Sequence, residues 1–381
     1  MERFAFIIHP MDLKRDAARK YPVLKYMPLK GVQMLARRLG PSYMSHITGV
    51  RSATGAECEG WLLGCSLDPE MLLSMPEEFV YDKIAACGRY AAELGAKIVG
   101  LGAFTSVVGD AGLSVAKRLE GVINVTSGNS YTTYTAIEGL MRGAELMEID
   151  AANARCAVVG ATGSIGALCA QMMARRTGAL TLIGRDEAKM EPLRAQILRE
   201  HPGTDVKIST DVRALRECDL VLAVSSATDA LIFPEHLRSG AVVCDVARPR
   251  DVSKSVVDQR DDVLVIEGGI IDVPGPADFA FDFGFPSGTA YACMSETILM
   301  ALEGTYEPYT LGRDLTVEQV ERIGQIAHKH GFKISGFRAF ERAVTDETIA
   351  QVRANARGRR VTSLPNPKEA AKDPAVVSVP A

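Results

Sequence analysis

The sequence predicts an α/β protein built from two consecutive α/β units, followed by helices that return toward the first unit. Short apolar runs alternate with longer segments of helical periodicity along most of the 381 residues, which is typical of parallel sheets covered by helices. The chain is also too long for one ordinary domain. We expect a substrate unit at 1–150, a second unit at 151–285, C-terminal helices at 286–345 and a disordered, Pro-punctuated tail at 355–381.

The elements of the first unit follow from apolar runs and from helix boundary signals. We predict strands at 3–10, 96–104 and 122–129, and helices at 76–95, 110–121 and 130–149. The helix at 76–95 begins with proline and two acids and ends at a glycine, as helix ends commonly do. The long helix at 130–149 leads out of this unit.

The second unit repeats the alternation of strands and helices. We predict strands at 155–160, 179–185, 218–226, 241–247 and 262–269, with a helix at 164–178. A turn-rich stretch at 272–288 then leads to two helices, at 290–304 and 316–332. The first of these helices carries Cys293 near its start.

Composition excludes several classes of protein. The formal net charge of −4 argues against a general nucleic-acid binder, and no apolar run approaches the roughly 18 residues of a membrane span. The N-terminal apolar run is too short for a secretory signal. The eight cysteines form no C-x-x-C pair and no cluster with histidine, so neither zinc, nor another metal site, nor a disulfide framework is expected. We expect a cytoplasmic protein with reduced thiols.

A glycine-rich loop, VVGATGSIG, separates the first strand and the first helix of the second unit. Its glycines Gly160, Gly163 and Gly166 allow a tight turn and a close approach to a pyrophosphate, which the following helix N-terminus attracts. This context predicts a Rossmann unit that binds a dinucleotide rather than a plain glycine turn. The other candidate cofactor residues are in this loop or at later strand ends: Thr162, Ser164, Ile165, Ser225, Gly268 and Gly269.

The residues after the second strand of this unit indicate which cofactor binds. A carboxylate at that position would hold the ribose hydroxyls of NAD, but this chain has Arg185 first and Asp186 behind it. Because arginine can bind a 2′-phosphate bidentately, NADPH is favoured. The alternative is that Arg185 is an exposed arginine with no ligand.

Two known architectures share this arrangement of units. The chain resembles shikimate dehydrogenases in layout and in the sequence NVT at 124–126, but that family's lysine is missing, since no lysine follows before Arg142. It also resembles glutamyl-tRNA reductases in layout, whose cysteine lies early in a motif that Cys58 does not match.

A third resemblance covers most of residues 60–335. The chain is similar to the long-chain acyl-(acyl-carrier-protein) reductases of cyanobacteria, in the stretches LGAFTSVV (101–108), TSGNSYTTY (126–134), VVGATGSIG (158–166), IEGGII (266–271), YACMSETILMALEG (291–304) and HKHGF (328–332). The resemblance implies NADPH-dependent reduction of a fatty acyl thioester to an aldehyde, with Cys293 as the acylated nucleophile. It also marks His330 as a family position, whereas Tyr131 stands where the family has histidine.

The predicted position of Cys293 is compatible with a reactive thiol. With Thr289 as a candidate N-cap, Cys293 falls in or just after the first helical turn. A helix end and one nearby cation can lower a cysteine pKa from about 8.5 to about 7, which raises the thiolate fraction at pH 7 from roughly 3% to a half. Packing is the alternative for Cys293 and our interpretation of the other seven cysteines.

The remaining candidate catalytic groups are hydroxyls and a histidine. Ser106, Ser130 and Tyr131 come from polar loops at predicted strand ends and are candidates for oxyanion donors, although each residue is commonly a simple loop cap. His330 is assigned through the resemblance alone. Two other functions stay open, namely a hydroxy-acid dehydrogenase that does not need Cys293 and a non-enzymatic NADP-binding redox sensor.

Residues 11–51, which precede the predicted helix at 76–95, form a basic segment. Between Met11 and Arg51 there are nine Lys/Arg and two acids: Lys14, Arg15, Arg19, Lys20, Lys25, Lys30, Arg37, Arg38 and Arg51, against Asp12 and Asp16. Such a patch attracts an acidic acyl carrier protein or the phosphates of acyl-CoA. The alternatives are a solvated helix face and a membrane surface that delivers fatty substrates. The sequence predicts no particular oligomeric state.

Overall fold

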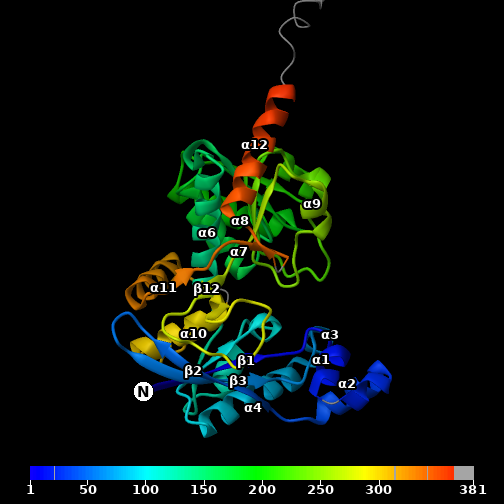
Figure 1. The fold of residues 1–381 in the computed structure, drawn as a ribbon, viewed down its shortest axis with the longest axis vertical. Coiled ribbons are helices and arrows are strands. Elements are labelled where there is room, and N and C mark those ends of the chain that lie inside the picture. Colours follow the sequence, from blue (N-terminus) through cyan, green and yellow to red (C-terminus); the bar gives the residue numbers. More distant parts are fainter. Residues whose placement is uncertain (21, 313–314, 341, 364–381) are drawn as a thin grey trace, which may run out of the picture.

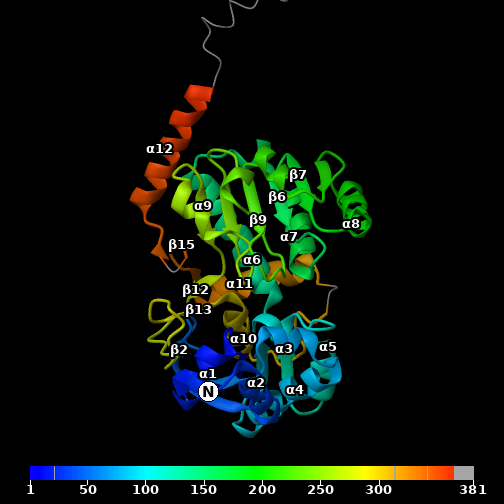
Figure 2. The same cartoon turned by 90° about the vertical axis from the view of Figure 1, so that its right-hand side faces the viewer.

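The α/β class predicted from the sequence is confirmed by the structure. The computed structural model describes residues 1–20, 22–312, 315–340 and 342–363. Two α/β parts lie one above the other, and both views show C-terminal elements between them (Figures 1 and 2). Within the described ranges, every helix falls short of the length and apolarity that a membrane crossing needs.

The lower part contains a five-stranded sheet in the order β2-β3-β1-β4-β5. Its strands are β1 (Glu2–Ile8), β2 (Ser42–Arg51), β3 (Glu57–Gly64), β4 (Ile98–Leu101) and β5 (Asn124–Thr126). All neighbouring pairs are parallel except β2 with β3. The hairpin of β2 and β3 was not predicted from the sequence, because β2 mixes polar and apolar residues without strict alternation and its pairing with β3 is interrupted by irregularities.

A C-terminal helix covers one face of this sheet, and N-terminal helices cover the other. The N-terminal helices are α1 (Leu13–Lys20), η1 (Pro22–Tyr26), α2 (Leu29–Arg38), α3 (Pro69–Ser74), α4 (Glu77–Glu93), η2 (Ala103–Ser106) and α5 (Leu113–Arg118). Successive side chains of a strand point to opposite faces. Accordingly, Ala5 and Ile7 pack with α4, whereas Phe4 and Phe6 pack with a C-terminal helix.

The upper part contains a six-stranded parallel sheet in the order β8-β7-β6-β9-β10-β11. Its strands are β6 (Arg155–Val159), β7 (Ala179–Ile183), β8 (Asp205–Ser209), β9 (Leu220–Ala223), β10 (Val242–Asp245) and β11 (Leu264–Glu267). This order is that of a Rossmann fold, whose ligand crevice lies where the strand order reverses, here between β6 and β9. The structure therefore confirms the predicted Rossmann unit.

Helices and short 3-10 turns flank the upper sheet. They are α6 (Asn129–Leu146), η3 (Ala151–Asn153), α7 (Ser164–Ala174), α8 (Glu187–Glu200), η4 (Val212–Glu217), η5 (Pro234–His236) and α9 (Lys254–Gln259). Helix α6 begins beside the lower sheet and packs much of its length against β9, β10 and β11. Helix α6 packs against both parts, so the chain crosses from one part to the other along this helix. We propose a domain boundary at 150/151, after the end of α6.

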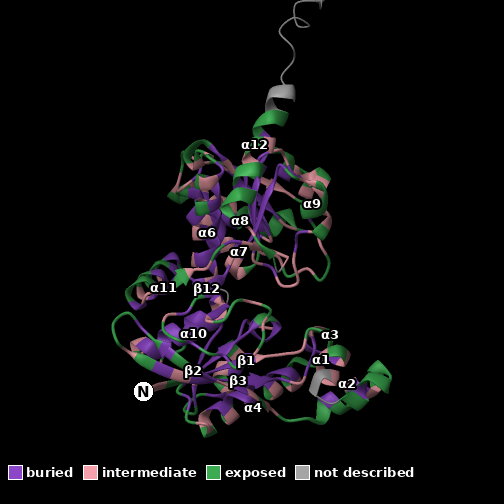
Figure 3. Cartoon of the chain, viewed as in Figure 1, coloured by how far each residue is buried: buried purple, intermediate pink, exposed green. Residues whose placement is uncertain are grey.

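The C-terminal elements connect the two parts. They are β12 (Ile270–Asp272), β13 (Thr289–Tyr291), α10 (Ala292–Glu303), α11 (Val317–His330), β14 (Lys333–Ile334), β15 (Arg338–Ala339), β16 (Arg342–Ala343) and α12 (Asp346–Ser363). Helix α10 returns to the lower sheet and covers Phe4 and Phe6. Figure 3 shows that α10, α6 and the strands form the buried centre of the molecule. We propose that the predicted segment at 286–345 acts as this connection.

The end of the chain differs from the prediction. Residues 355–363 continue helix α12, whereas the sequence analysis expected disorder from 355 onward. Helix α12 buries Ile349 and Val352 against the upper core, and Arg353 forms an ion pair with Glu148 at 2.9 Å. These contacts stabilise a segment whose own sequence has little periodicity. The rest of the predicted tail, 364–381, lies outside the described residues.

Candidate active site

A cavity of about 1860 Å³ lies between the two sheets. Ordinary ligand pockets enclose roughly 300–1,000 Å³, so this space can hold two ligands side by side. One wall comes from loops at the carboxyl ends of the upper strands, and the other comes from the lower sheet and from α1, η1 and α2. The start of helix α10 lies between these walls.

The glycine loop forms the dinucleotide side of the cavity. Gly160 has a φ of +86°, and an added Cβ would lie 2.8 Å from the Cα of Ser225. A Cβ on Gly166 would lie 2.1 Å from the carbonyl oxygen of Gly160, so this helix turn packs directly on the loop. Gly163 is the N-cap of α7, whose free N–H groups face the cavity. The cavity lining here includes Gly160, Thr162, Gly163, Ser164 and Ile165.

The later strand ends complete this side. Ser225, Gly268 and Gly269 all line the cavity. However, the hydroxyl of Ser225 donates to the buried carboxylate of Asp251, and its N–H donates to the same carboxylate at 2.8 Å. The polar groups of Ser225 therefore anchor its loop. Ser225 lines the cavity, but its hydroxyl is already engaged by Asp251.

Two arginines line the cavity beyond the end of β7. Arg185 follows β7, and Arg213 comes from η4, where it forms an ion pair with Asp211 at 2.7 Å. Asp186 does not compete for a ribose, because its carboxylate caps α8 by accepting from the N–H of Ala188 at 3.0 Å. The glycine cradle and the two exposed cations fit NADPH, in agreement with the predicted cofactor.

Cys293 is the second residue of α10 and lines the cavity. The N–H of Ala292 donates to the carbonyl of Gly269 at 2.7 Å, which fixes the start of α10 against the end of β11. The expected N-cap was Thr289, but Tyr291 occupies that position, because Thr289 belongs to β13 and its hydroxyl bonds to Pro286.

A second helix N-terminus meets the cysteine. Gly128 is the N-cap of α6, with a φ of +76°, and an added Cβ would lie 2.3 Å from the Cβ of Cys293. This contact needs glycine at 128. The start of α6 therefore packs against Cys293 at the start of α10. The first-turn N–H groups of the two helices, apart from that of Tyr131, which donates to Glu296, are candidate donors to a developing oxyanion.

The pKa of Cys293 corrects the expectation of an activated thiol. Burial raises its pKa to about 12; the N–H of Met294 opposes the rise, Glu296 adds to it, and Arg248 opposes it. The rise from 9.0 corresponds to roughly 4 kcal/mol, more than the 2 kcal/mol that a helix end contributes at best. Burial thus favours the protonated form of the Cys293 thiol at neutral pH.

Arg248 supplies a cation close to the thiol. It lines the cavity, and a guanidinium N–H donates to the buried carboxylate of Glu267 at 2.9 Å. Arg250 donates to the same carboxylate at 2.8 Å. The paired carboxylate holds Arg248 in place, where its charge favours the thiolate of Cys293.

Glu296 is a buried carboxylate on the same helix as Cys293. It accepts hydrogen bonds at 2.5 Å from the hydroxyls of Thr126 and Thr310, and one at 2.8 Å from the N–H of Tyr131 in α6. Burial raises its pKa, while these hydrogen bonds oppose the rise. Glu296 thus joins α10 to the N-terminus of α6 and is a candidate proton carrier three residues after the thiol.

The three predicted hydroxyl donors have different locations. Ser106 lines the cavity, and its hydroxyl donates to the carbonyl of Ala103 at 2.7 Å. Ser130 and Tyr131 are buried in α6 and do not line the cavity, so their side chains are not brought to a ligand. The hydroxyl of Ser130 finds no partner among the described residues, and Tyr131 stacks on Tyr134. Both residues lie in the first turn of α6 and are buried where α6 packs against α10.

His330 lies far from the cysteine, contrary to its predicted role. Its ring forms hydrogen bonds of 2.6 Å with Ser52 and with Glu303. Glu303 is ten residues beyond Cys293 in α10, which is about 15 Å along the helix. The ring therefore ties α11 to α10 and to the lower sheet.

Several site residues were not identified from the sequence. Glu296 carried a usable signal, because a carboxylate three residues after Cys293 shares its helix face. The roles of Gly128 and Arg248 depend on the tertiary approach of α6 and of the loop after β10. No group of His, Cys, Asp or Glu in the described ranges could hold a metal ion.

The lower end of the cavity is apolar. Its lining there comes from buried side chains of α1, η1 and α2 and from the residue that follows β3, namely Leu13, Leu24, Val32, Ala36 and Cys65. We call this region the apolar arm. It belongs to the same cavity as Cys293, and its five side chains are uncharged and largely apolar, so it is suited to a hydrocarbon chain.

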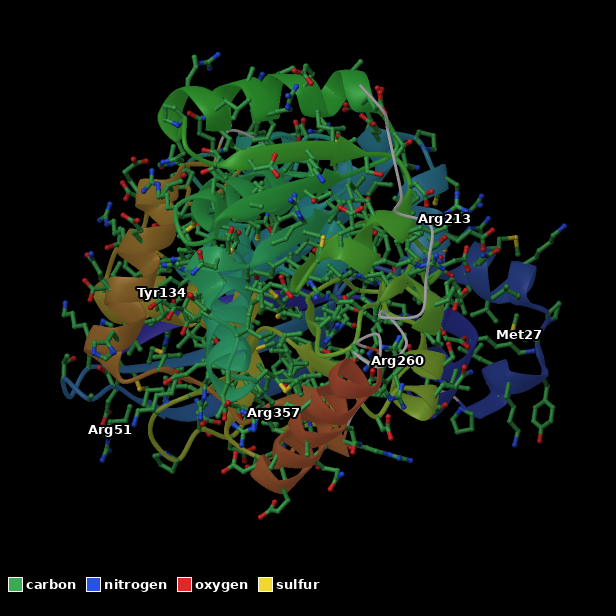
Figure 4. The ribbon with its side chains drawn as sticks, turned by 90° about the horizontal axis from the view of Figure 1, so that it is seen from above. Met27, Arg51, Tyr134, Arg213, Arg260 and Arg357 are labelled. Atoms are coloured by element: carbon green, nitrogen blue, oxygen red, sulfur yellow. The ribbon has the colours of Figure 1, made fainter. Side chains whose placement is uncertain are left out.

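The basic segment does not form one surface. Arg51 lies in β2, where it forms an ion pair with Glu57 at 2.7 Å. Figure 4 shows Arg51 on the side of the molecule opposite Met27, which lies between η1 and α2. The patch is therefore limited to α1, η1 and α2, and the side chains of Arg19 and Lys20 lie outside the described part.

Known proteins resemble parts or most of this chain. The family model described as Shikimate / quinate 5-dehydrogenase matches residues 144–267, which contain the upper sheet. L-tryptophan dehydrogenase from Nostoc punctiforme is similar in structure over 94% of this chain and 89% of its own, with 12% identity and a TM-score of 0.42.

Two curated relatives cover most of the chain. The long-chain acyl-[acyl-carrier-protein] reductase of Synechococcus elongatus is 28% identical over 345 residues, which span 87% of this chain and 98% of that protein. The aminotransferase PigE of a Serratia species is 33% identical over 346 residues, 87% of this chain, but the chain spans only 39% of its length. The resemblance to the acyl reductases that the motifs indicated is confirmed.

Proposed function

We propose that this protein, which is similar to the long-chain acyl-[acyl-carrier-protein] reductases over most of its length, reduces a fatty acyl thioester to an aldehyde with NADPH. The observation that carries the proposal is the position of Cys293, where the starts of α6 and α10 pack together in the cavity shared by the glycine loop and the apolar arm. An oxidoreductase acting on a small hydroxy acid would need neither the thiol nor the arm.

The acyl donor is an acyl carrier protein or coenzyme A thioester. The apolar arm receives the hydrocarbon chain, which places the thioester carbonyl beside Cys293. The sulfur of Cys293 forms a bond to the carbonyl carbon, and the carrier thiolate leaves and is protonated. Free first-turn N–H groups of α6 and α10 stabilise the oxyanion of this step.

The proton of the thiol must leave before or during the attack. Arg248 favours the thiolate through its charge, and Glu296 is the buried carboxylate nearest in sequence that can take a proton. Protonation of Glu296 also removes the negative charge that disfavours the thiolate. The two residues thereby reduce the cost of ionising a buried thiol.

The glycine loop, Arg185 and Arg213 would hold NADPH. When bound, NADPH supplies the hydride that reduces the acyl group to the aldehyde level. The sulfur of Cys293 then leaves as the aldehyde carbonyl forms, and the thiol is restored for the next acyl group.

The test uses fatty acyl thioesters of coenzyme A and of acyl carrier protein, with chain lengths ranging from octanoyl to stearoyl. Each thioester is added to the protein together with NADPH. We expect NADPH consumption with an equal amount of aldehyde, trapped as a hydrazone. If none of these thioesters causes NADPH consumption, or if turnover occurs only with shikimate or another hydroxy acid, the proposal is overturned.

A further inference from the structure

The segment that covers the apolar arm has an unusual outer surface. We call residues 11–43 the cap; it contains α1, η1 and α2 and lies at the edge of the molecule (Figures 1 and 3). Its inner side chains are part of the lower core, for example Leu13, Val32 and Ala36. The cap is therefore held to the sheet by one side only.

The outer side of the cap is apolar to an unusual degree. Half of the large hydrophobic side chains exposed in the described structure, eight of sixteen, belong to the cap: Met11, Val23, Tyr26, Leu29, Met34, Leu35, Leu39 and Tyr43. Tyr26 is 78% exposed, Val23 67% and Met34 61%. Contiguous exposed apolar side chains of this kind mark a surface that contacts another molecule or a membrane.

Exposed cations accompany these apolar side chains in the described part of the cap, namely Arg15, Lys25, Lys30, Arg37 and Arg38. Residues 11–40 contain eight Lys/Arg and two acids, in a chain of net charge −4. Both acids are engaged at the start of α1: Asp16 contacts Arg15 at 3.4 Å, and Asp12, just before the helix, accepts from the N–H of Arg15 at 2.9 Å. Lys25 lies 4.7 Å from the ring centroid of Tyr26. The outer face thus combines positive charge with protruding apolar groups, as interfacial helices do.

The cavity opens at this same surface. Met11, Val23, Leu35, Leu39 and Tyr43 are both exposed and part of the cavity lining. They share one cavity with the side chains of the apolar arm. The cavity that contains the arm therefore reaches the exposed apolar side of the cap.

We propose that the cap docks on an anionic lipid surface, with the mouth of the apolar arm toward the hydrocarbon. The cations attract the lipid headgroups, and Val23, Tyr26 and Met34 enter the interface. A fatty chain then moves between the arm and the bilayer without crossing water. An acidic carrier protein would dock through the cations, whereas the three most exposed apolar side chains of the cap, Val23, Tyr26 and Met34, together with the cations match an interfacial membrane surface. The movement of a fatty chain between the arm and the bilayer rests on the proposed function, whereas docking on lipid does not.

The test measures flotation of the protein with lipid vesicles, without substrate or NADPH. We expect the protein to float with vesicles of phosphatidylcholine containing about one third phosphatidylglycerol, and far less with phosphatidylcholine alone. The double variant Arg37→Glu/Arg38→Glu should weaken binding at least about 30-fold. The variant Tyr26→Ser/Met34→Ser should weaken it about tenfold or more, with the charge unchanged.

Matched controls come from exposed residues outside the cap. Lys117→Glu/Lys333→Glu reverses two exposed cations, and Val122→Ser/Val257→Ser removes two exposed apolar groups. Both controls should float like the parent protein, and all variants should keep the parent's thermal unfolding midpoint.

Absence of vesicle binding by the parent protein, or equal losses in the control variants, would overturn the docking proposal. So would cap variants that bind vesicles normally but show a raised KM for an acyl carrier protein thioester, because the patch would then serve the carrier. Failure of the proposed function would appear separately, as an absence of aldehyde formation in vesicle-free buffer.

Discussion

Iodoacetamide should alkylate Cys293 more slowly than an ordinary exposed cysteine, because burial raises its pKa to about 12. At pH 8 a free cysteine with a pKa of about 8.5 is roughly one quarter thiolate, whereas a thiol of pKa 12 is thiolate in about one molecule in ten thousand. The more basic thiolate is intrinsically about 25–55-fold more nucleophilic, which offsets part of this difference. The net expectation is a rate about 40- to 100-fold below that of a free cysteine.

Mass spectrometry of the peptide that contains Cys293 measures this rate directly. The other seven cysteines are buried, so they give little native labelling. Since the thiolate fraction grows about tenfold per pH unit below the pKa, the rate should still be rising between pH 8 and pH 10. The variant Arg248→Leu should react more slowly, because the cation that favours the thiolate is gone. A profile that levels off near pH 7 would refute the raised pKa and restore the activated thiol expected from the sequence.

Three substitutions test other parts of the site. Gly128→Ala should lower kcat about 100-fold with little change in NADPH affinity, because the added Cβ displaces Cys293. The control Gly121→Ala, at a similar φ but in open space, should leave kcat unchanged. Equal kcat values for the two variants would contradict this prediction. Arg185→Ala should weaken NADPH binding by about 1.5–3 kcal/mol and NADH binding little, as measured by titration; equal losses would mean a structural role. His330→Leu should lower the free energy of unfolding by about 2 kcal/mol but leave kcat unchanged; loss of kcat without loss of stability would restore its catalytic role.

Local sequence signals predicted the cofactor side of the site well. The strand, glycine loop and helix around residues 155–178 are adjacent in the chain, so their spacing alone indicates the Rossmann unit. The position of Cys293 at the start of a helix was also evident from local signals. The division of roles between Arg185 and Asp186 needed the structure, because only there is Asp186 seen to cap α8.

Properties that depend on packing could not be predicted in the same way. The pKa of Cys293 is set by burial under α6, which outweighs the helix-end effect visible in the sequence. His330 matched a family motif, but the packing of α11 places it at the far end of α10. The charge count of the basic segment was correct, although strand β2 carries Arg51 away from the cap.

The central claim is that Cys293 carries the acyl group. Incubating the protein with palmitoyl-coenzyme A in the absence of NADPH, followed by intact-mass and peptide analysis, tests it most directly. We predict one added palmitoyl group on Cys293, its release as aldehyde when NADPH is added, and no adduct in Cys293→Ala, which still binds NADPH. Aldehyde formation by Cys293→Ala at a rate near that of the parent protein, or an adduct on another residue, would contradict the thioester mechanism.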